Sequence, residues 1–426
     1  MDRSIDLPRI VQLAQIISQH VPSLQETLTT HGVPSPSFSP DATSQMPQEA
    51  YRDIYVILDA AEELRDLLLD PLHLLFKYGG HINCASLQAI SRLKIAAAVP
   101  IEGQVSFAHI AKMTGMDDIM VRRLLRHAMT MRIFCEPEPN MVAHTRASRW
   151  LTAPDMNQWL SNGTEVMWPA ASRMVDAAQK WPGSQEINET AWALANNTSE
   201  SVYHMIATDP KSATRFADTM KAFTSTPEYS VSFIVNSYDW ETLGKARIVD
   251  VGGSEGHVAM ALTRSHPKLE VIVQDLEVVT EEAAETVPKD LKGRVSFMPH
   301  DFFTTQPAQA DVYLLRLILH NWPDKYCLKI LRSLVPVLRP WTLIIINEIC
   351  MPDHEASIPL WKERDLRAAD LNMGAIFNSR ERSRSEWHEL LAEADSRFFL
   401  RRVVEPEGST LALLEVIWDV KSYLVR

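Results

Sequence analysis

The chain has 426 residues, so two or three domains are expected. Hydrophobic residues make up 46% of it and charged residues 23%, which is the composition of an ordinary folded protein. Its 54 acidic residues outnumber its 42 basic residues and give a net charge of −12. This balance argues against nucleic acid or an anionic membrane as a partner, because both carry negative charge themselves.

The cysteine pattern and the apolar runs bear on the compartment. Cys84, Cys135, Cys327 and Cys350 include no CxxC pair, so neither a disulfide framework nor a cysteine zinc site is expected, and a reducing compartment fits. The first residues lack the apolar run of a signal peptide, and no window approaches the roughly 18 apolar residues of a membrane span. We therefore expect a cytoplasmic protein without a membrane partner.

Residues 1–85 are predicted to form a helical segment. Apolar residues at helical spacing predict an amphipathic helix over residues 8–30. A run rich in proline and serine follows and predicts a mobile loop over residues 31–49. A second helical stretch is predicted over residues 50–77.

Residues 86–160 have the pattern of a winged helix. An apolar helix over residues 87–99 precedes a helix–turn–helix pattern over residues 106–131, and two β-like runs follow around Ile133 and Val142. One function of such a module is DNA binding through Arg122, Arg123 and Arg126 on its second helix. The other is packing against a partner subunit, which the acidic character of the whole chain favours.

Residues 161–426 are predicted to form an α/β domain, with a helical segment over residues 161–245 that contributes the substrate pocket. Beyond this segment, apolar runs alternate with helical ones, which predicts a mostly parallel sheet covered by helices. Five runs are apolar enough for strands buried on both faces, namely residues 246–251, 269–276, 294–301, 310–319 and 342–349. Two later runs, residues 398–406 and 410–420, are predicted to pair as a closing hairpin.

Polar residues and glycines follow each of the five predicted strands. In such a sheet, ligands bind at the carboxyl ends of the strands, so these residues are expected to share one edge. The first strand contains Asp250 and ends at Gly252, Gly253 and Gly256, the second ends at Asp275, the third at His300 and Asp301, the fourth at His320 and Asn321, and the fifth at Glu348.

The glycine turn limits the choice of cofactor. The dinucleotide motif G-x-G-x-x-G would need glycines where Ser254 and His257 stand, and no GK[ST] of a P-loop follows. A glycine turn with an acidic residue at the end of the next strand suits a nucleoside without phosphates, whose ribose hydroxyls Asp275 can accept. No metal is expected, because the HELLA sequence at His388 lacks the second histidine of HExxH. No GxSxG elbow for a serine nucleophile occurs either.

Five segments together resemble the successive motifs of S-adenosylmethionine (SAM)-dependent O-methyltransferases. These segments are DVGGSEGHVAMAL, VIVQDLEVV, PHDFF, LILHNWPDKYCLKILR and INEICMP. They are most similar to the plant caffeate-type and fungal secondary-metabolite family, and the resemblance covers the chain beyond about residue 50. It implies a Rossmann-like SAM-binding domain, an N-terminal all-α and winged-helix dimerisation domain, a homodimer and a small-molecule substrate.

The resemblance also implies roles for single residues. His320 is the general base in this reading, and Glu348 and Glu381 are two acids that orient it. Contacts to SAM are implied for the turn glycines and for Asp250, Asp275, Leu276, Asp301, Phe302 and Arg316. Elementary chemistry agrees, because a phenol with a pKa of about 10 is mostly protonated at neutral pH and needs a base. A carboxylate on one imidazole nitrogen leaves the other free to act as that base. A surface ion pair with Arg380 or Arg382 is the other interpretation of Glu381.

The acceptor pocket and two departures from the family pattern complete the expectations. Pocket-lining positions in the family correspond to Trp168, Phe216, Met220, Phe223, Trp322, Asn372, Met373 and Phe377, each of which could equally belong to the core. Asn321 and Lys325 stand where the family usually has acidic residues, which predicts a more positive local charge.

Three functions remain open from the sequence. The first is methylation of a hydroxyl on a small phenolic or enolic secondary metabolite. The second is an enzyme of the same fold that binds SAM without consuming it and catalyses dehydration or a pericyclic cyclisation. The third is a DNA-binding regulator that has kept the SAM site as a sensor.

Overall fold

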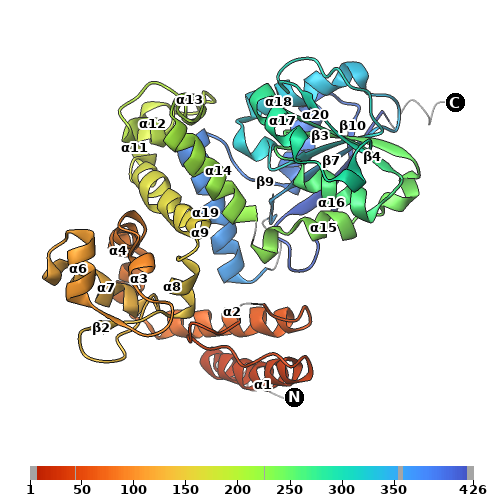
Figure 1. Ribbon diagram of the computed structural model, residues 1–426. Coiled ribbons are helices and arrows are strands. Elements are labelled where there is room, and N and C mark those ends of the chain that lie inside the picture. Colours follow the sequence, from red (N-terminus) through yellow and green to blue (C-terminus); the bar gives the residue numbers. More distant parts are fainter. Residues whose placement is uncertain (1–6, 44, 225, 354–357, 420–426) are drawn as a thin grey trace, which may run out of the picture. The chain divides into compact units, whose positions relative to one another are not determined.

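Figure 1 shows a computed structural model of the chain, in which residues 7–43, 45–224, 226–353 and 358–419 are described. The chain divides into two compact units. Unit 1 consists of Met1–Pro169, Asp209–Ala222 and Ser357–Asp365, and unit 2 of Ala170–Thr208, Phe223–Ala356 and Leu366–Arg426. None of the described helices is long and apolar enough to cross a membrane.

Unit 1 begins with two packed helices, α1 (Arg9–Thr30) and α2 (Ala50–Leu68). The helical stretch predicted over residues 50–77 is not one helix, because α2 ends at Leu68 and α3 (Pro71–Tyr78) begins after two intervening residues. Asp70 caps α3 by accepting the N–H groups of Leu72 and His73. Pro71 occupies the first helical position, where its missing N–H costs nothing.

The described part of the predicted loop over residues 31–49 forms no regular helix or strand and lies against the winged-helix module. The carbonyl of Phe38 accepts the N–H of Arg146 at 3.1 Å, and the guanidinium of Arg132 lies over the Phe38 ring. Asp41 pairs with Arg149. These contacts give the loop partners in unit 1 that a search for periodicity does not reveal.

The winged helix is present, but its wing differs from the prediction. Its helices pack around a core that includes Phe107 and Leu125. The run around Ile133 forms no regular strand, because Arg132 and Phe134 have φ angles of 63° and 62°, which are incompatible with an extended backbone. The two predicted runs are still joined by one antiparallel bridge, between Cys135 and Ala143. The second wing strand also pairs with Val105 and Ser106, directly before the first helix of the helix–turn–helix. The elements are α4 (His81–Arg92), α5 (Ile95–Ala98), β1 (Val105–Ser106), α6 (Phe107–Thr114), α7 (Asp118–Thr130) and β2 (Met141–Val142).

The chain continues through short helices in both units. These are α8 (Arg146–Trp150), α9 (Pro154–Asn162), η1 (Gly163–Met167), α10 (Trp168–Ala171), α11 (Met174–Lys180), α12 (Ala191–Ala195), α13 (Val202–Thr208), α14 (Pro210–Thr224), η2 (Pro227–Tyr229), α15 (Val231–Asn236) and η3 (Trp240–Leu243).

Unit 2 is built on a seven-stranded sheet with the order β10-β11-β7-β6-β3-β4-β5. All five strands predicted from the apolar runs are present and pair in parallel, and the predicted hairpin adds two antiparallel strands at one edge. The bounds are β3 (Ala246–Val251), β4 (Leu269–Asp275), β5 (Val295–Pro299), β6 (Val312–Arg316), β7 (Leu343–Glu348), β10 (Phe398–Val404) and β11 (Ala412–Trp418).

Helices cover both faces of this sheet (Figure 1). Alternate strand residues explain the two cores, because successive side chains of a strand point to opposite faces. Val249 packs with α18 (Asp324–Leu334) and α20 (Arg384–Ala394) on one face, and its neighbour Ile248 packs with α15 and α16 (His257–Ser265) on the other. The remaining elements are α16 (His257–Ser265), α17 (Glu277–Glu285), η4 (Lys289–Leu291), η5 (Leu319–Asn321), α18 (Asp324–Leu334), η6 (Val335–Val337), β8 (Cys350–Met351), α19 (Leu360–Phe377), β9 (Arg382–Ser383) and α20 (Arg384–Ala394).

Candidate active site

The turn after β3 leaves no room for side chains. Gly252 has a φ of 71°, and a Cβ placed there would lie 2.5 Å from Cδ1 of Ile318. A Cβ on Gly256, with a φ of 74°, would lie 2.9 Å from the ring of Phe297. The N–H groups of Gly252 and Gly253 both donate to the carbonyl of Gln274 on β4. The turn is therefore tight, and only glycine allows its backbone to approach its neighbours so closely.

Two acidic side chains lie at the ends of the next strands. Asp275, at the end of β4, accepts the N–H groups of Ser254 and Leu276 at 2.9 and 2.8 Å. Asp301 follows β5 and accepts the N–H of Phe303 at 2.9 Å. Each carboxylate has more acceptor sites than these bonds use, so both can accept further hydrogen bonds from a ligand.

A buried acid and a buried base lie beneath the glycine turn. Burial raises the pKa of Asp250 to about 7, against the opposing attraction of Arg316. Burial lowers the pKa of Arg316 to about 10, and Asp250 again acts in the other direction. Arg316 donates to the side-chain oxygen of Asn347 and to the carbonyl of Tyr229. Within the described part of the chain, Oδ2 of Asp250 has no hydrogen-bond partner.

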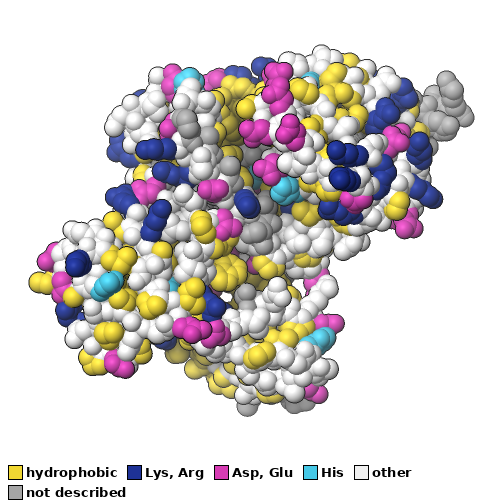
Figure 2. All heavy atoms as spheres, viewed as in Figure 1, with side chains coloured by type: hydrophobic (Ala, Val, Ile, Leu, Met, Phe, Trp, Pro, Cys, Tyr) yellow, Lys and Arg dark blue, Asp and Glu magenta, His cyan; other side chains and the backbone are white. Residues whose placement is uncertain are grey.

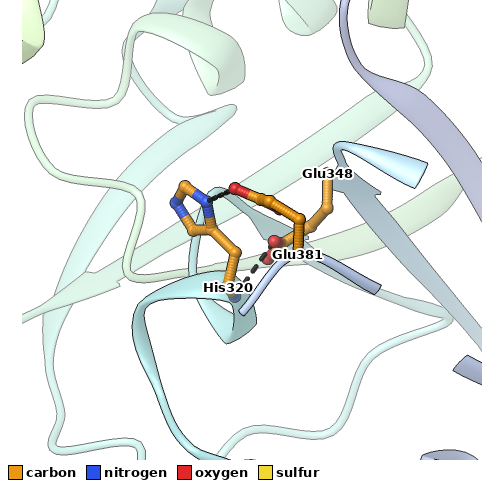
Figure 3. Close-up of side chains that lie close together, drawn as sticks. All are labelled: His320, Glu348 and Glu381. Atoms are coloured by element: carbon orange, nitrogen blue, oxygen red, sulfur yellow. Dashed lines mark hydrogen bonds and ion pairs between the residues drawn. The ribbon is translucent and has the colours of Figure 1, made fainter. Parts of the chain in front are cut away.

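His320 lies in the short turn η5 that follows β6, and two glutamates approach it (Figure 3). Nδ1 of His320 is 2.8 Å from Oε1 of Glu381, whose side chain is only 1% exposed. Glu348 does not contact the imidazole. Its carboxylate accepts the backbone N–H groups of Ile318, Leu319 and His320 at 2.9, 2.7 and 3.0 Å. One glutamate thus holds the ring and the other holds the turn.

The electrostatics make His320 a strong base. Burial lowers the pKa of the imidazole, but attraction by the carboxylates of Glu381 and Glu348 and the hydrogen bond to Glu381 raise it more. The net pKa is about 9, with Arg382 acting against the glutamates. Burial raises the pKa of Glu348, and the positive charge of His320 opposes that rise. In the unliganded protein at neutral pH, His320 is therefore mainly an imidazolium.

The same three side chains have atoms close enough to hold a metal ion, within 4.8 Å of one another. However, both oxygens of Glu348 already accept backbone N–H groups, and Nδ1 of His320 is bonded to Glu381. A metal would have to displace these bonds. We keep the absence of a metal as a prediction.

Glu381 is not part of a surface ion pair. Arg380 pairs with Asp324 and Glu386, and Arg382 pairs with Asp324. Within the described residues, Oε2 of Glu381 is buried without a hydrogen-bond partner.

The positive charge expected from Lys325 is offset. Its ammonium pairs with the carboxylate of Glu186, so the departure at this position adds no uncompensated charge. Asn321, the other departure, donates from Nδ2 to the carbonyl of Leu317 at 3.0 Å. It therefore helps to hold the turn that carries His320.

Several residues that hold the site were not singled out from the sequence. The hydroxyl of Ser379 donates to the carbonyl of His320 at 2.6 Å, and Asp370 accepts the N–H of Glu381 at 2.8 Å. Arg382 is fully buried behind the turn. Ser379 and Arg382 lie in the same SRERS segment as Glu381, but no periodicity distinguishes them from solvent-exposed polar residues.

The residues predicted to line the acceptor pocket fall into both units. Trp322 stacks on Tyr203 with ring centroids 4.7 Å apart, and Phe377 packs against the same tyrosine. Trp322 also contacts Phe302, so this part of the predicted set joins an aromatic cluster in unit 2. Of the remaining predicted residues, Asn372 and Met373 are half-buried in unit 2, Trp168 and Phe216 are half-buried in unit 1, Met220 is exposed in unit 1, and the side chain of Phe223 lies outside the described part.

The fold is that of an α/β domain with a glycine turn, two acidic strand ends and a histidine–glutamate pair at one sheet edge. Comparison with known families is consistent with this class. Residues 182–397 match the O-methyltransferase domain, and residues 77–154 match the O-methyltransferase dimerisation domain. The chain belongs to the O-methyltransferase family and is a SAM-dependent O-methyltransferase.

Similar proteins of known name agree. The O-methyltransferase PaMT of Phomopsis amygdali is 44% identical over 413 residues, which cover 96% of this chain and 97% of that protein. The chlorophenol O-methyltransferase of Trichoderma longibrachiatum is 33% identical, with 96% and 90% covered. The crystal structure of OxaC has a TM-score of 0.76 at 21% identity and covers 96% of this chain and all of that one. At this identity the last likeness shows the fold alone.

Proposed function

We propose that the enzyme transfers the methyl group of SAM to a hydroxyl of a small phenolic or enolic secondary metabolite, with His320 as general base. The observation that carries the proposal is the buried pair of His320 and Glu381, which lies at the sheet edge where such folds bind ligands. The name of the chlorophenol O-methyltransferase among the relatives supports a phenolic acceptor.

The residues at this edge fit SAM. The tight turn of Gly252, Gly253 and Gly256 permits a close backbone approach. Asp275 and Asp301 have acceptor capacity for ribose and adenine groups. Leu276 and Phe302 would supply apolar contacts, and Asp250 and Arg316 would complete the polar floor beneath the turn. SAM supplies a methyl group that its sulfonium already activates, so the protein needs only to position an acceptor and remove its proton.

His320 is suited to take that proton. When Nδ1–H donates to Glu381, the lone pair of Nε2 is free to accept a proton from the acceptor hydroxyl. Attraction by the two glutamates raises the pKa of His320 toward that of a phenol, about 10, which favours transfer of the proton from the acceptor. The imidazole must first lose the proton that it holds at neutral pH. A neighbouring positive charge, such as that of a sulfonium, favours this loss.

The test is incubation of the purified protein with SAM and a panel of phenols and enols, followed by mass spectrometry. We expect a product heavier by one methyl group and one S-adenosylhomocysteine per product. His320→Ala is expected to lower kcat by about 10²- to 10⁴-fold, which is the usual contribution of a general base. If His320→Ala turned over at the wild-type rate, the proposed role of His320 as general base would be contradicted.

The same measurement separates the proposal from an enzyme that keeps its SAM. A solved structure titled "A Pericyclic Reaction enzyme" has a TM-score of 0.72 to this chain at 24% identity, which is a likeness of fold alone. Cyclised or dehydrated product without S-adenosylhomocysteine would favour that alternative.

The DNA-binding alternative would need free cations on the winged helix. In unit 1, however, Arg126 pairs with Glu136 and Arg122 with Asp118, which offsets two of the cations that DNA binding would need.

We also propose the domain division predicted from the sequence. Residues 1–85 and the winged helix of residues 86–160 serve dimerisation. Residues 161–426 carry out methyl transfer, and their segment 161–245 lines the acceptor pocket. The family match to a dimerisation domain supports a homodimer. Figure 2 shows hydrophobic side chains gathered on unit 1. Helix α3 has no buried residue, and Leu72, Leu75 and Phe76 are 72%, 73% and 80% exposed.

A homodimer would cover this apolar helix. Phe76→Glu is expected to shift the sedimenting species from dimer toward monomer, because a charge cannot be buried in an apolar interface without a large cost. A monomeric wild-type protein at micromolar concentration would contradict the dimer. A cytoplasmic location and the lack of nucleic-acid and membrane partners stay predictions.

A further inference from the structure

Arg382 is buried directly behind the turn of residues 317–322 that carries His320, which is named the catalytic turn after the proposed role of that histidine. It follows Glu381 and starts β9, which pairs in parallel with β8 just beyond Glu348. Successive side chains of an extended segment point in opposite directions. Glu381 accordingly reaches the imidazole of His320, while Arg382 reaches the backbone of the same turn. Its guanidinium is fully shielded from solvent.

The guanidinium binds the carbonyl groups on both sides of His320. Its Nη1 donates to the carbonyl of Leu319 at 3.3 Å, and its Nη2 donates to that of Trp322 at 3.0 Å. Nε and Nη2 also donate to Oδ1 of Asp324, the first residue of α18, at 3.0 and 2.7 Å. An arginine fork can make these bonds at the same time, whereas a lysine cannot.

Arg382 and Glu348 hold the turn in complementary ways. Glu348 accepts the N–H groups of Ile318, Leu319 and His320, and Arg382 donates to the carbonyls of Leu319 and Trp322. The backbone around the histidine is thus bonded on its donor side by a buried anion and on its acceptor side by a buried cation.

We propose that Arg382 is a positioning residue for methyl transfer, which fixes the turn that carries His320 and balances the charge of the two glutamates. This rests on the proposed function of His320 as the base. The charged groups that act on the imidazole are Glu381, Glu348 and Arg382, and Arg382 alone of the three disfavours the imidazolium.

Two substitutions separate the geometry from the charge. Arg382→Lys keeps the positive charge but loses the fork, and Arg382→Met loses both the fork and the charge while keeping an unbranched apolar stem, so the difference between the two variants reports the charge. Asp324 still has Arg380 as a partner in both variants. Arg380→Met is the matched control, because Arg380 pairs with the same carboxylate from an exposed position.

We expect kcat to fall by about 10- to 100-fold in Arg382→Lys, since a displaced reactive group costs rate, while KM for SAM and for the acceptor changes by less than about threefold. The acid limb of the pH profile of kcat should stay in place in this variant. In Arg382→Met the limb should move to higher pH, because loss of a cation favours the imidazolium. Arg380→Met should leave kcat within about twofold of the wild type and the acid limb of kcat at the wild-type pH.

A second readout keeps this inference separate from the proposed function. The imidazole of His320 can be titrated by ¹⁵N NMR without turnover, with its signal assigned by its loss in His320→Ala. The titration midpoint should rise in Arg382→Met and stay close to wild type in Arg382→Lys. If His320→Ala remains active, the base proposal fails, while the NMR result still decides the electrostatic role of Arg382. Folded Arg382→Lys with wild-type kcat, or a midpoint unmoved in folded Arg382→Met, would overturn the inference. If Arg382→Met does not fold, the kcat of Arg382→Lys decides.

Discussion

The glycine turn after β3 and the catalytic turn after β6 are neighbours that are held in different ways. Their strands pair in the middle of the sheet, and the turns touch where a Cβ on Gly252 would meet Ile318. The glycine turn is fixed mainly by its glycines and by two backbone bonds to Gln274, and the Asp275 side chain of the next strand adds one bond to the N–H of Ser254. The catalytic turn is fixed by side chains from distant segments, among them Glu348 and Ser379.

This difference shows two ways in which the backbone conformation of a turn is held at one sheet edge. The glycine turn needs little more than local sequence, because a positive φ and a tight approach are properties of glycine itself. The catalytic turn includes Leu317 with a φ of 54°, an unfavourable backbone for leucine, so other elements must hold it. The following predictions test this contrast, from the largest expected effect to the smallest.

Glu348→Gln should damage the catalytic turn most. The amide that replaces the carboxylate brings N–H donors toward the backbone N–H groups of the turn, and it removes a charge that stabilises the imidazolium. We expect kcat to fall by about 100-fold or more, because the turn no longer presents His320 correctly. Steady-state kinetics with both substrates saturating measures this. Glu389→Gln, at an exposed position of α20, is the control and should change kcat less than twofold or so.

Gly252→Ala should damage the glycine turn. A Cβ at this position meets Cδ1 of Ile318 at 2.5 Å and the φ of 71° is strained for alanine, so either the glycine turn or the Ile318 side chain must shift. We expect the Kd for SAM, measured by calorimetry, to rise by about 10- to 100-fold, equivalent to about 1.4–2.7 kcal/mol. Gly293→Ala is the control for the effect of placing alanine at a positive φ without a steric contact, since Gly293 has a φ of 86° and nothing lies within 4 Å of its Cβ position. Equal SAM affinity in both variants would show that the close contact is unimportant.

The pH profile should reveal how the carboxylates tune His320. Because the histidine acts as a base in its neutral form and the glutamates raise its pKa, activity should increase as pH rises through that pKa. Glu381→Gln removes an attraction that raises this pKa, so the acid limb of kcat should move to lower pH. Its maximum rate should also fall, because the hydrogen bond no longer fixes the tautomer. A limb at the same pH in both enzymes would contradict the assignment of this ionisation to His320.

Leu317→Gly should have the smallest effect. Glycine relieves the unfavourable φ of 54°, which costs a leucine about 1–2 kcal/mol, but it gives up the packing of a half-buried side chain. We expect the two contributions to offset within about 1 kcal/mol in the free energy of unfolding, measured with urea. A much larger loss would mean that the leucine side chain itself supports the turn.

The sheet and the order of the residues at its edge could be predicted from local sequence. Apolar runs marked all five parallel strands and the closing hairpin, because a buried strand must be apolar over its whole length. The parallel arrangement then brings strand ends such as Asp275 and His320 to one edge. Two features were harder to predict from the sequence. The start of α3 at Pro71 depends on a cap at Asp70, and the wing of the winged helix depends on positive φ angles at Arg132 and Phe134.

Which charged side chains meet became clear only from the folded arrangement. Glu381 and His320 are 61 positions apart, and no periodicity links them, yet their side chains form a hydrogen bond. Glu348 turned out to bind the backbone of the catalytic turn and not the imidazole, and the buried Arg382 looked like any polar residue of the SRERS segment. The physical reason is the separation along the chain of the residues that interact. Strands and glycine turns depend on neighbours in the chain, whereas the ionisation and orientation of a buried histidine depend on whichever charges the fold places around it.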